Sequence, residues 1–264
     1  MTEALLNNAV RRLAAAGIDN PRLDARLLMA HAHGDSTLFE SCVARRAARE
    51  PLAYITGHRE FWSLDFEVGP GVLVPRPETE TIIEQALAQL TDRTPPLKVL
   101  DFGTGTACLL TAFLKEYPNA HGLGLEISNE ARTFALRNIT RHGLGARCEI
   151  RAGGWPVAFF GSYDVILSNP PYIKTADIAG LEPEVSCYEP ALALDGGPDG
   201  LTAYRALAPE IARLLGPGGY AFVEIGTGQD EAAGRLFGEA GLELRGIAAD
   251  LAGIPRVLTM RAKK

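Results

Sequence analysis

The feature of this sequence that most limits its fold is the regular alternation of short apolar runs and longer amphipathic segments after Lys98. Strands that alternate with helices form a parallel sheet covered by helices on both faces. We predict strands at 98–102, 122–126, 147–151, 163–168, 220–225, 242–247 and 256–260, and helices near 108–117, 129–142, 201–215 and 229–240. Because no helix separates the last two strands, we expect an α/β fold with a mostly parallel seven-stranded sheet whose last strand is antiparallel.

The first 58 residues show helical spacing instead. Three helices are predicted: one that ends at Gly17, one that begins after Asn20, and one that begins with a capping box of Thr37 and Glu40. Apolar residues three or four apart indicate the inward faces of the first two helices: Leu6, Val10 and Leu13, then Leu23, Leu27 and Ala30. The third helix ends in arginines that are typical of a solvated face and, less often, of a partner surface: Arg45, Arg46 and Arg49.

Residues 59–76 have the pattern of a β-hairpin. Apolar and polar side chains alternate from Trp62 to Val68, which indicates a strand with one buried face. Gly69-Pro70-Gly71 would turn the chain, and 72–74 would return it. We therefore expect a helical domain at 1–58, a hairpin linker at 59–76 and the sheet domain at 77–264.

Charge and composition exclude several functions. The net charge is −6, and because residues 1–60 carry +1, residues 61–264 carry −7. A body this acidic repels a phosphate backbone, which counts against direct nucleic-acid binding. The four cysteines form no CxxC pair, and the one closely spaced histidine pair, His31 and His33, would point to different sides of a helix, so no metal site is expected. No apolar run is long enough for a membrane span and no signal peptide is evident, so we expect a cytoplasmic protein.

A glycine-containing loop follows the first strand of the predicted sheet. Its sequence, Gly103-Thr104-Gly105-Thr106-Ala107, lies between a strand and a helix, where a ligand can approach the backbone closely. Glu126 ends the next strand, 21 residues after Gly105, at the place where an acidic residue binds ribose hydroxyls. The loop lacks the fingerprints for triphosphates and dinucleotides, which leaves a nucleoside without a diphosphate, such as S-adenosylmethionine.

A second motif, Asn169-Pro170-Pro171-Tyr172, follows the fourth strand of the sheet. The prolines have no N–H, so their carbonyls are free to accept hydrogen bonds, and Asn169 adds a side-chain acceptor. Tyr172 can lie against a planar group. These groups suit an –NH2 on a conjugated carbon, because acceptors that hold its hydrogens can align its lone pair with a sulfonium methyl group. A methyl transfer to an amide or to a nucleobase amine remains open at this point.

The sequence resembles the bacterial release factor glutamine methyltransferases, a family of the Rossmann-like methyltransferase class. The resemblance covers nearly the whole chain and rests on the stretches 51–57, 60–62, 74–80, 103–107, 169–172, 181–185, 193–197 and 224–226. It implies that Gly103, Thr104, Gly105, Thr106 and Ala107 contact the methionine part of S-adenosylmethionine, Glu126 its ribose and Trp155 its adenine. It also implies that Asn169 touches cofactor and substrate, and that Asn169, Pro170, Pro171 and Tyr172 hold the glutamine of a release factor's Gly-Gly-Gln loop, with Asn169, Pro170 and Tyr172 as the catalytic residues. The N-terminal helices would help to dock the release factor.

The chain departs from the family pattern at three places. Ala107 stands where the loop ends in glycine, Gly154 stands where an aspartate precedes the tryptophan, and the helical region between Leu28 and Arg45 is shorter than usual. Two alternative functions stay open: an adenine or guanine exocyclic-amine methyltransferase that acts on nucleic acid, and a cofactor-binding methyltransferase fold with little or no turnover.

Overall fold

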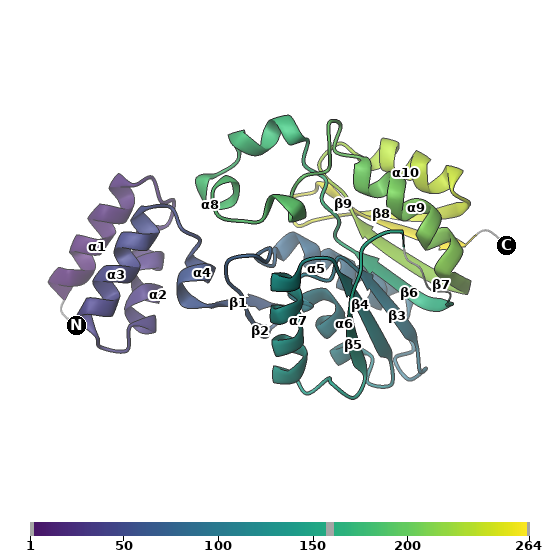
Figure 1. Cartoon of the computed structure of the whole chain (residues 1–264), viewed down its shortest axis with the longest axis horizontal. Helices are drawn as coiled ribbons and strands as arrows, with labels where there is room; N and C mark the ends of the chain where they lie inside the picture. The colour runs from purple at the N-terminus through teal and green to yellow at the C-terminus, as the bar shows by residue number, and fades with distance from the viewer. Residues whose placement is uncertain (1–2, 157–160, 263–264) are drawn as a thin grey trace.

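The predicted strands form a single seven-stranded sheet in the computed structural model, which describes residues 3–156 and 161–262. The strand order is β5-β4-β3-β6-β7-β9-β8 (Figure 1). The bounds are β3 (Lys98–Phe102), β4 (His121–Glu126), β5 (Cys148–Ala152), β6 (Tyr163–Ser168), β7 (Leu215–Glu224), β8 (Leu242–Ala249) and β9 (Pro255–Ala262). Strand β9 is antiparallel to both of its neighbours, which confirms the predicted sheet. The strand order reverses at β3, so β3 and β6 flank the switch point where open α/β sheets bind ligands.

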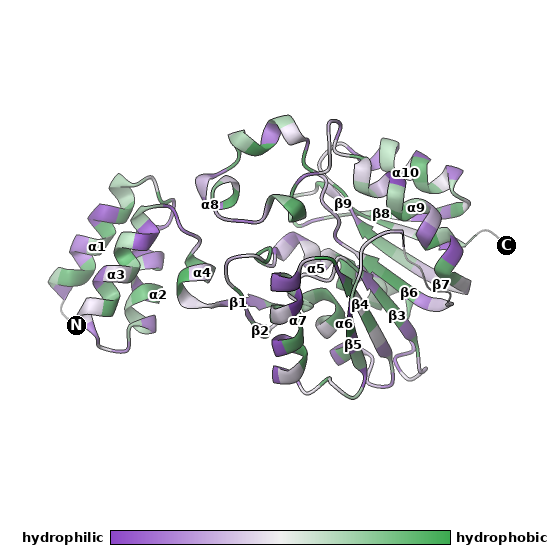
Figure 2. Cartoon of the chain, viewed as in Figure 1, coloured by the Kyte–Doolittle hydropathy of each residue, from purple (hydrophilic) through white to green (hydrophobic). Residues whose placement is uncertain are grey.

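Helices cover the two faces of this sheet because successive side chains of each buried strand point to opposite sides. The covering helices are α5 (Glu80–Gln89), α6 (Cys108–Glu116), α7 (Asn129–Arg141), α9 (Thr202–Leu214) and α10 (Asp230–Glu239). Val99 and Val165 pack with α5 and α6 on one face, and Leu100 and Ile166 pack with α9 and α10 on the other. Figure 2 shows that apolar residues concentrate in the strands between these two layers.

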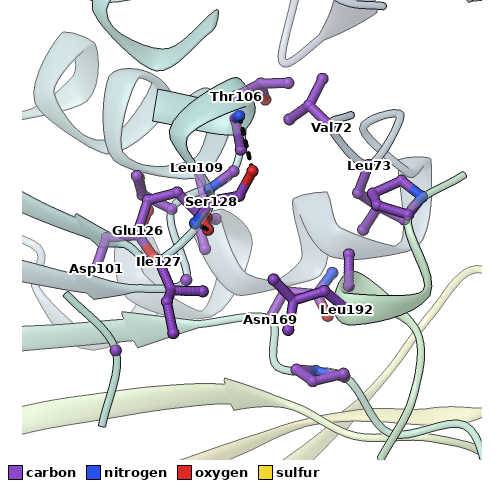
Figure 3. A pocket seen from close by; sticks show the side chains of 18 of the residues that line it. Val72, Leu73, Asp101, Thr106, Leu109, Glu126, Ile127, Ser128, Asn169 and Leu192 are labelled. Atoms are coloured by element: carbon purple, nitrogen blue, oxygen red, sulfur yellow. Dashed lines mark hydrogen bonds between the residues drawn. The ribbon is translucent and has the colours of Figure 1, made fainter. Parts of the chain in front are cut away.

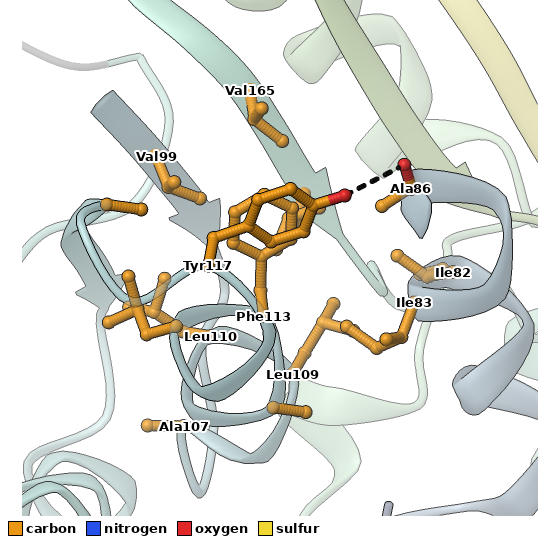
Figure 4. Packing of buried hydrophobic residues seen from close by; sticks show 14 of the residues in the cluster. Ile82, Ile83, Ala86, Val99, Ala107, Leu109, Leu110, Phe113, Tyr117 and Val165 are labelled. Atoms are coloured by element: carbon orange, nitrogen blue, oxygen red, sulfur yellow. Dashed lines mark hydrogen bonds between the residues drawn. The ribbon is translucent and has the colours of Figure 1, made fainter. Parts of the chain in front are cut away.

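Aromatic side chains fill the core under α6. Tyr117 stacks on Phe113 with 4.4 Å between the ring centroids, and both are fully buried. The Tyr117 hydroxyl lies within hydrogen-bond distance of two carbonyl oxygens at the end of α5, that of Ala86 (Figure 4) and that of Leu90. A buried tyrosine hydroxyl needs such a partner, and here the partner fixes α5 against α6.

The N-terminal helices form a separate layer with a core of their own. They are α1 (Glu3–Ala15), α2 (Pro21–His31), α3 (Ser36–Ala47) and the short α4 (Leu52–Thr56), and they lie beside the sheet (Figure 1). Leu13, Leu28 and Phe39 are completely buried among them. Because these side chains are buried among the helices themselves, the helices have their own hydrophobic core and do not depend on the sheet for apolar contacts.

Two expectations for these helices are wrong. The residue that caps α3 is Asp35, whose carboxylate accepts from the backbone N–H of Thr37 and Leu38, so the third helix begins before the Thr37 and Glu40 pair. In α2, the predicted inward face is partly outward, because Leu23 and Leu27 are 55% and 43% exposed. The buried side chains of α2 are Asp24, Ala25 and Leu28. The inward face of α2 therefore includes the charged residue Asp24 in place of the apolar residues that the spacing indicated.

The hairpin exists, but it lies elsewhere than predicted. β1 (His58–Phe61) pairs antiparallel with β2 (Leu64–Glu67), and Trp62 and Ser63 form the turn between them. Both turn residues have positive φ, a conformation usually taken by glycine or asparagine, so their residue types carry no turn signal. Residues 72–74, expected as the returning strand, are not in a strand.

The connection from β6 to α9 is long and crosses towards the N-terminal helices. It contains the 3-10 helices η2 (Thr175–Gly180) and η3 (Ala191–Ala193) and the single turn α8 (Pro183–Ser186). Arg46 donates to Asp24 and Glu184 at 2.7 Å each, and Arg49 contacts Glu184 and Glu182. The prediction of a solvated arginine face is therefore wrong for Arg46, which is buried in a charge network between the helical layer and this connection. In the described part of the chain, no helix is long and apolar enough to cross a membrane.

Candidate active site

A cavity of about 340 Å³ lies at the carboxyl ends of β3, β4 and β6. Its floor comes from the glycine loop and Glu126, and its other walls come from Val72, Leu73, Asn169 and Leu192 (Figure 3). The position is the switch point of the sheet, and the size suits a small-molecule ligand. A second cavity of about 330 Å³ adjoins it, and Asn169, Arg76, Leu73 and Ala193 line both.

The glycine loop turns tightly because three of its residues adopt the left-handed conformation. Gly103, Gly105 and Ala107 have φ values of 69°, 55° and 61°. The N–H groups of Gly103 and Thr104 both donate to the carbonyl of Leu125, at 2.9 and 3.0 Å, which ties the loop to β4. Ala107 is an L-residue in a region that glycine favours, and its methyl group is fully buried in the core under α6.

Glu126 holds the loop and the start of α7 together. Its two carboxylate oxygens accept from the backbone N–H of Gly105 and of Ser128, each at 2.9 Å. The side chain is 8% exposed and lines the first cavity. Each carboxylate oxygen has two lone pairs, so both oxygens can still accept from a ligand hydroxyl.

Asp101, at the end of β3, is a second carboxylate in the same cavity. Burial raises its pKa to about 7, against the hydrogen bond from Thr104 Oγ1 at 2.6 Å and with a contribution from the nearby charge of Glu126. The sequence analysis assigned no role to Asp101. A buried acid at the carboxyl end of a parallel strand was the available signal.

Trp155 borders the cavity on the side of β5. Its ring packs edge-on against Phe102, with 6.4 Å between the centroids, and lies near Gly103. Gly154 precedes it, and a Cβ built there would make only ordinary contact, 3.5 Å from Ile127 Cδ1. The backbone at Gly154 therefore accommodates a side chain.

The tetrapeptide 169–172 divides between the two cavities. Pro171 lines the first cavity, Pro170 and Tyr172 line the second, and Asn169 stands at the border. The Asn169 Nδ2 donates to Thr79 Oγ1 at 2.9 Å, and the Tyr172 hydroxyl donates to Glu224 at 3.1 Å. Burial is the main cause that raises the pKa of Tyr172, so its hydroxyl stays protonated at neutral pH.

Close packing explains why glycine occurs at two positions in the stretches 193–197 and 224–226, which resemble the family. A Cβ on Gly196 would lie 2.8 Å from the backbone of Tyr172, and one on Gly226 would lie 2.9 Å from its ring. Gln229 donates to the carbonyl of Tyr172 at 2.9 Å. These contacts fix both the backbone and the ring of Tyr172 against the end of β7.

Most predicted site residues come together, and some others were missed. The first cavity is lined by Gly103, Thr104, Gly105, Thr106, Glu126, Trp155, Asn169 and Pro171. Ala107 does not line it and supports the loop from below. The missed residues are Thr79, Arg76, Asp101, Glu224 and the segment 190–195. Thr79 and Glu224 lie in stretches that carried the family resemblance, which was the only sequence signal for them. Among the described residues, no group of three metal-ligating side chains is present.

Comparisons with known proteins give the class of the fold. Residues 82–180 match the model of the methyltransferase small domain, and residues 4–38 match that of the PrmC N-terminal domain. The fold is similar to a ribosomal protein L11 methylase from Lactobacillus delbrueckii subsp. bulgaricus (TM-score 0.55, 19% identity, 75% of this chain and 84% of that one) and to a methyltransferase from Pyrococcus furiosus (TM-score 0.53, 20% identity, 84% and 96%). The match to the methyltransferase small domain and the fold together indicate a Rossmann-like methyltransferase domain.

Sequence relatives narrow this class. The release factor glutamine methyltransferase of Rhodospirillum rubrum is 42% identical over 98% of this chain and 84% of its own length. That of Cereibacter sphaeroides is 43% identical over 97% of this chain and 96% of its own. The chain belongs to the release factor glutamine methyltransferase family.

Proposed function

We propose that this enzyme transfers a methyl group from S-adenosylmethionine to the side-chain amide nitrogen of the glutamine in the Gly-Gly-Gln motif of peptide chain release factors. The observation that carries the proposal is the position of Asn169 at the border of two adjoining cavities. One cavity has the features of a nucleoside site, and the other has room for an amide side chain. The names of the relatives support the choice of release factors as substrate.

The first cavity fits S-adenosylmethionine by the chemistry of its lining. Asp101, Glu126 and Asp195 are acidic, and the one basic residue among the described lining residues, Arg76, is paired with Glu189 at 2.6 Å. Carboxylates suit ribose hydroxyls and a cationic amino group or sulfonium, and they repel phosphates. Glu126 would hold the ribose, the loop 103–106 the methionine part, and Trp155 the adenine. When bound, S-adenosylmethionine supplies an electrophilic methyl group.

The residues of the second motif prepare the amide nitrogen. An amide –NH2 is a weak nucleophile because its lone pair is delocalised into the carbonyl. Asn169 Oδ1 and the Pro170 carbonyl would accept its two hydrogens and so orient the lone pair, and Tyr172 would bound the amide plane. Positive charge that develops on nitrogen is stabilised by the same two acceptors, so their interaction strengthens in the transition state.

The N-terminal helices supply the docking surface in this proposal. A single amide group can make only a few contacts with the enzyme. Most of the binding energy for a release factor must therefore come from contacts remote from the reacting atoms. The pair of Arg46 and Glu184 joins the helical layer, α1 to α4, to the segment whose Leu181 and Val185 line the second cavity. A release factor held by this layer would therefore present its loop to the second cavity.

Separate incubations with tritium-labelled S-adenosylmethionine test the proposal. The acceptors are an intact release factor, free glutamine, duplex DNA and RNA. We expect label in the release factor alone. Label in a nucleic acid would identify a base methyltransferase, and no label in any tube would identify a fold that binds without turnover.

A further inference from the structure

Two buried residues outside the tetrapeptide connect its two polar side chains. Thr79 precedes α5, and Glu224 ends β7; they are 4% and 1% exposed. Thr79 Oγ1 lies 2.9 Å from Asn169 Nδ2 and 2.6 Å from Glu224 Oε2, and the other Glu224 oxygen lies 3.1 Å from the Tyr172 hydroxyl. One carboxylate therefore anchors Tyr172 directly and Asn169 through one hydroxyl.

The donor and the acceptor of each hydrogen bond in this series can be assigned in order. An ionised carboxylate only accepts, so Thr79 and Tyr172 must both donate their single hydroxyl hydrogen to Glu224. Thr79 has then no hydrogen left for Asn169 and can only accept from it. Asn169 must therefore turn its –NH2 towards Thr79. Its Oδ1 accepts no hydrogen bond from the described residues and is left for a ligand at the border of the cavities.

We propose that Thr79 and Glu224 are positioning residues that fix which end of the Asn169 amide faces the substrate. The inference rests on the proposed amide methylation, which needs an acceptor at that point. A reversed Asn169 would present a donor to the substrate –NH2 and would exclude it. Thr79 lines the first cavity and Glu224 the second, and in this proposal both act through their hydrogen bonds to Asn169 and Tyr172 rather than on the reacting atoms.

Protonation of Glu224 would release this constraint. A protonated carboxyl can donate to Thr79, whose own hydrogen is then free for Asn169 Oδ1, and the amide reverses. Burial is the main cause that raises the pKa of Glu224 to about 7, and the charge of Glu78 raises it further. Hydrogen bonds from Thr79 and Tyr172 and the charge of Arg256 lower this pKa in part. The charged groups around the pair Tyr172 and Glu224 are Arg76, Glu78 and Arg256. The correct orientation is thus favoured above about pH 7.

Variants of Thr79 test the inference through turnover of the release factor. Thr79→Val removes the hydroxyl at similar volume, Thr79→Ser restores it, and Thr81→Val makes the same change at a buried residue of α5 that forms no hydrogen bond with Asn169. We expect kcat to fall by roughly 10- to 100-fold in Thr79→Val, to stay within about threefold in Thr79→Ser, and to stay unchanged in Thr81→Val, with KM for both substrates within about threefold throughout. Equal kcat for Thr79→Val and Thr81→Val would overturn the inference. A wild-type enzyme without activity on release factors would instead refute the proposed function.

The pH profile of Glu224→Gln tests the role proposed for Glu224. Wild-type kcat should rise as Glu224 ionises near pH 7, and the glutamine variant should be slow and lack that rise, because its side chain cannot accept from both hydroxyls. Asp101 has a similarly raised pKa and is unchanged in the variant. A rise of the same size in Glu224→Gln would therefore assign the profile to another group and contradict the inference.

Discussion

The charge network between the helical layer and the β6–α9 connection gives a prediction with a built-in control. Glu184 accepts from Arg46 Nη1 at 2.7 Å and from Arg49 Nε at 2.8 Å, and its side chain is 17% exposed. Among the described residues, the Glu182 carboxylate accepts only from Arg49, and its side chain is 74% exposed. Glu184→Gln and Glu182→Gln therefore remove the same charge from the same turn, one from a half-buried site and one from a solvated site.

The expected losses of stability differ because solvent screens the exposed pair of Glu182 with Arg49 far more than the pairs that Glu184 forms with Arg46 and Arg49. Hydrogen bonds to charged groups contribute about 1.5–3 kcal/mol each, and the glutamine of Glu184→Gln keeps one neutral acceptor, so we expect this substitution to cost about 2 kcal/mol of unfolding free energy. Exposed pairs contribute about 0–1 kcal/mol, which is the expectation for Glu182→Gln. At roughly 2–4 °C per kcal/mol for a chain of this size, the midpoints should fall by about 4–8 °C and by less than about 4 °C.

The pH dependence of the same variants checks the cause. Burial by itself raises the pKa of Glu184, but the hydrogen bonds from Arg49 and Arg46 outweigh it and hold the pKa below the ordinary 4.5. A lowered folded pKa gives stability that is present above 4.5 and is lost as the pH falls through the folded value. The difference between wild type and Glu184→Gln should therefore shrink in acid. Thermal unfolding followed by circular dichroism measures it, and equal midpoints for Glu184→Gln and Glu182→Gln at pH 7 would refute the reasoning.

Four further substitutions address the site. Asn169→Ala should lower kcat by at least 100-fold with little change in KM, since its hydrogen bond strengthens in the transition state; steady-state kinetics within a few-fold of wild type would refute this role. Glu126→Ala should weaken S-adenosylmethionine binding by about 1.5–3 kcal/mol in calorimetry, and unchanged affinity would place the ribose elsewhere. Ala107→Gly should change stability by less than about 1 kcal/mol in urea unfolding, because relief of about 1–2 kcal/mol of left-handed strain offsets the lost methyl burial and the added freedom of glycine; a loss above about 2 kcal/mol would contradict it. Gly154→Asp should tighten S-adenosylmethionine binding by about 1 kcal/mol, roughly fivefold, since an aspartate there can accept from the adenine amine; weaker binding would show another route of adenine recognition.

The sheet domain could be predicted from sequence because its signals are local. Each buried strand is a short apolar run, and the helices between them end at recognisable turn residues, so β3, β6 and α7 match their predicted bounds to within one residue. The antiparallel pair β8 and β9 followed from the lack of a helix between them. The loop 103–106 and Asn169, which line one cavity, could be expected to lie together because both follow strands of one sheet, whose carboxyl ends meet at one edge.

The features that sequence reasoning missed depend on contacts between distant segments. Arg46 and Glu184 are 138 residues apart, and no local pattern distinguishes a buried arginine from a solvated one. Thr79 and Glu224 are 145 residues apart and become partners only when α5 packs against the sheet. The turn at Trp62 was missed because its left-handed backbone is imposed by the pairing of β1 with β2 rather than by residue type.

The most direct test of the proposed function is the position of the transferred methyl group. An intact release factor should be incubated with S-adenosylmethionine and either wild-type enzyme or Asn169→Ala, digested, and analysed by tandem mass spectrometry. We predict one added methyl group on the side-chain amide of the Gly-Gly-Gln glutamine with wild-type enzyme, and a strongly reduced amount with Asn169→Ala. An unmodified glutamine after incubation with wild-type enzyme, or a methyl group on another residue of the release factor, would contradict the account.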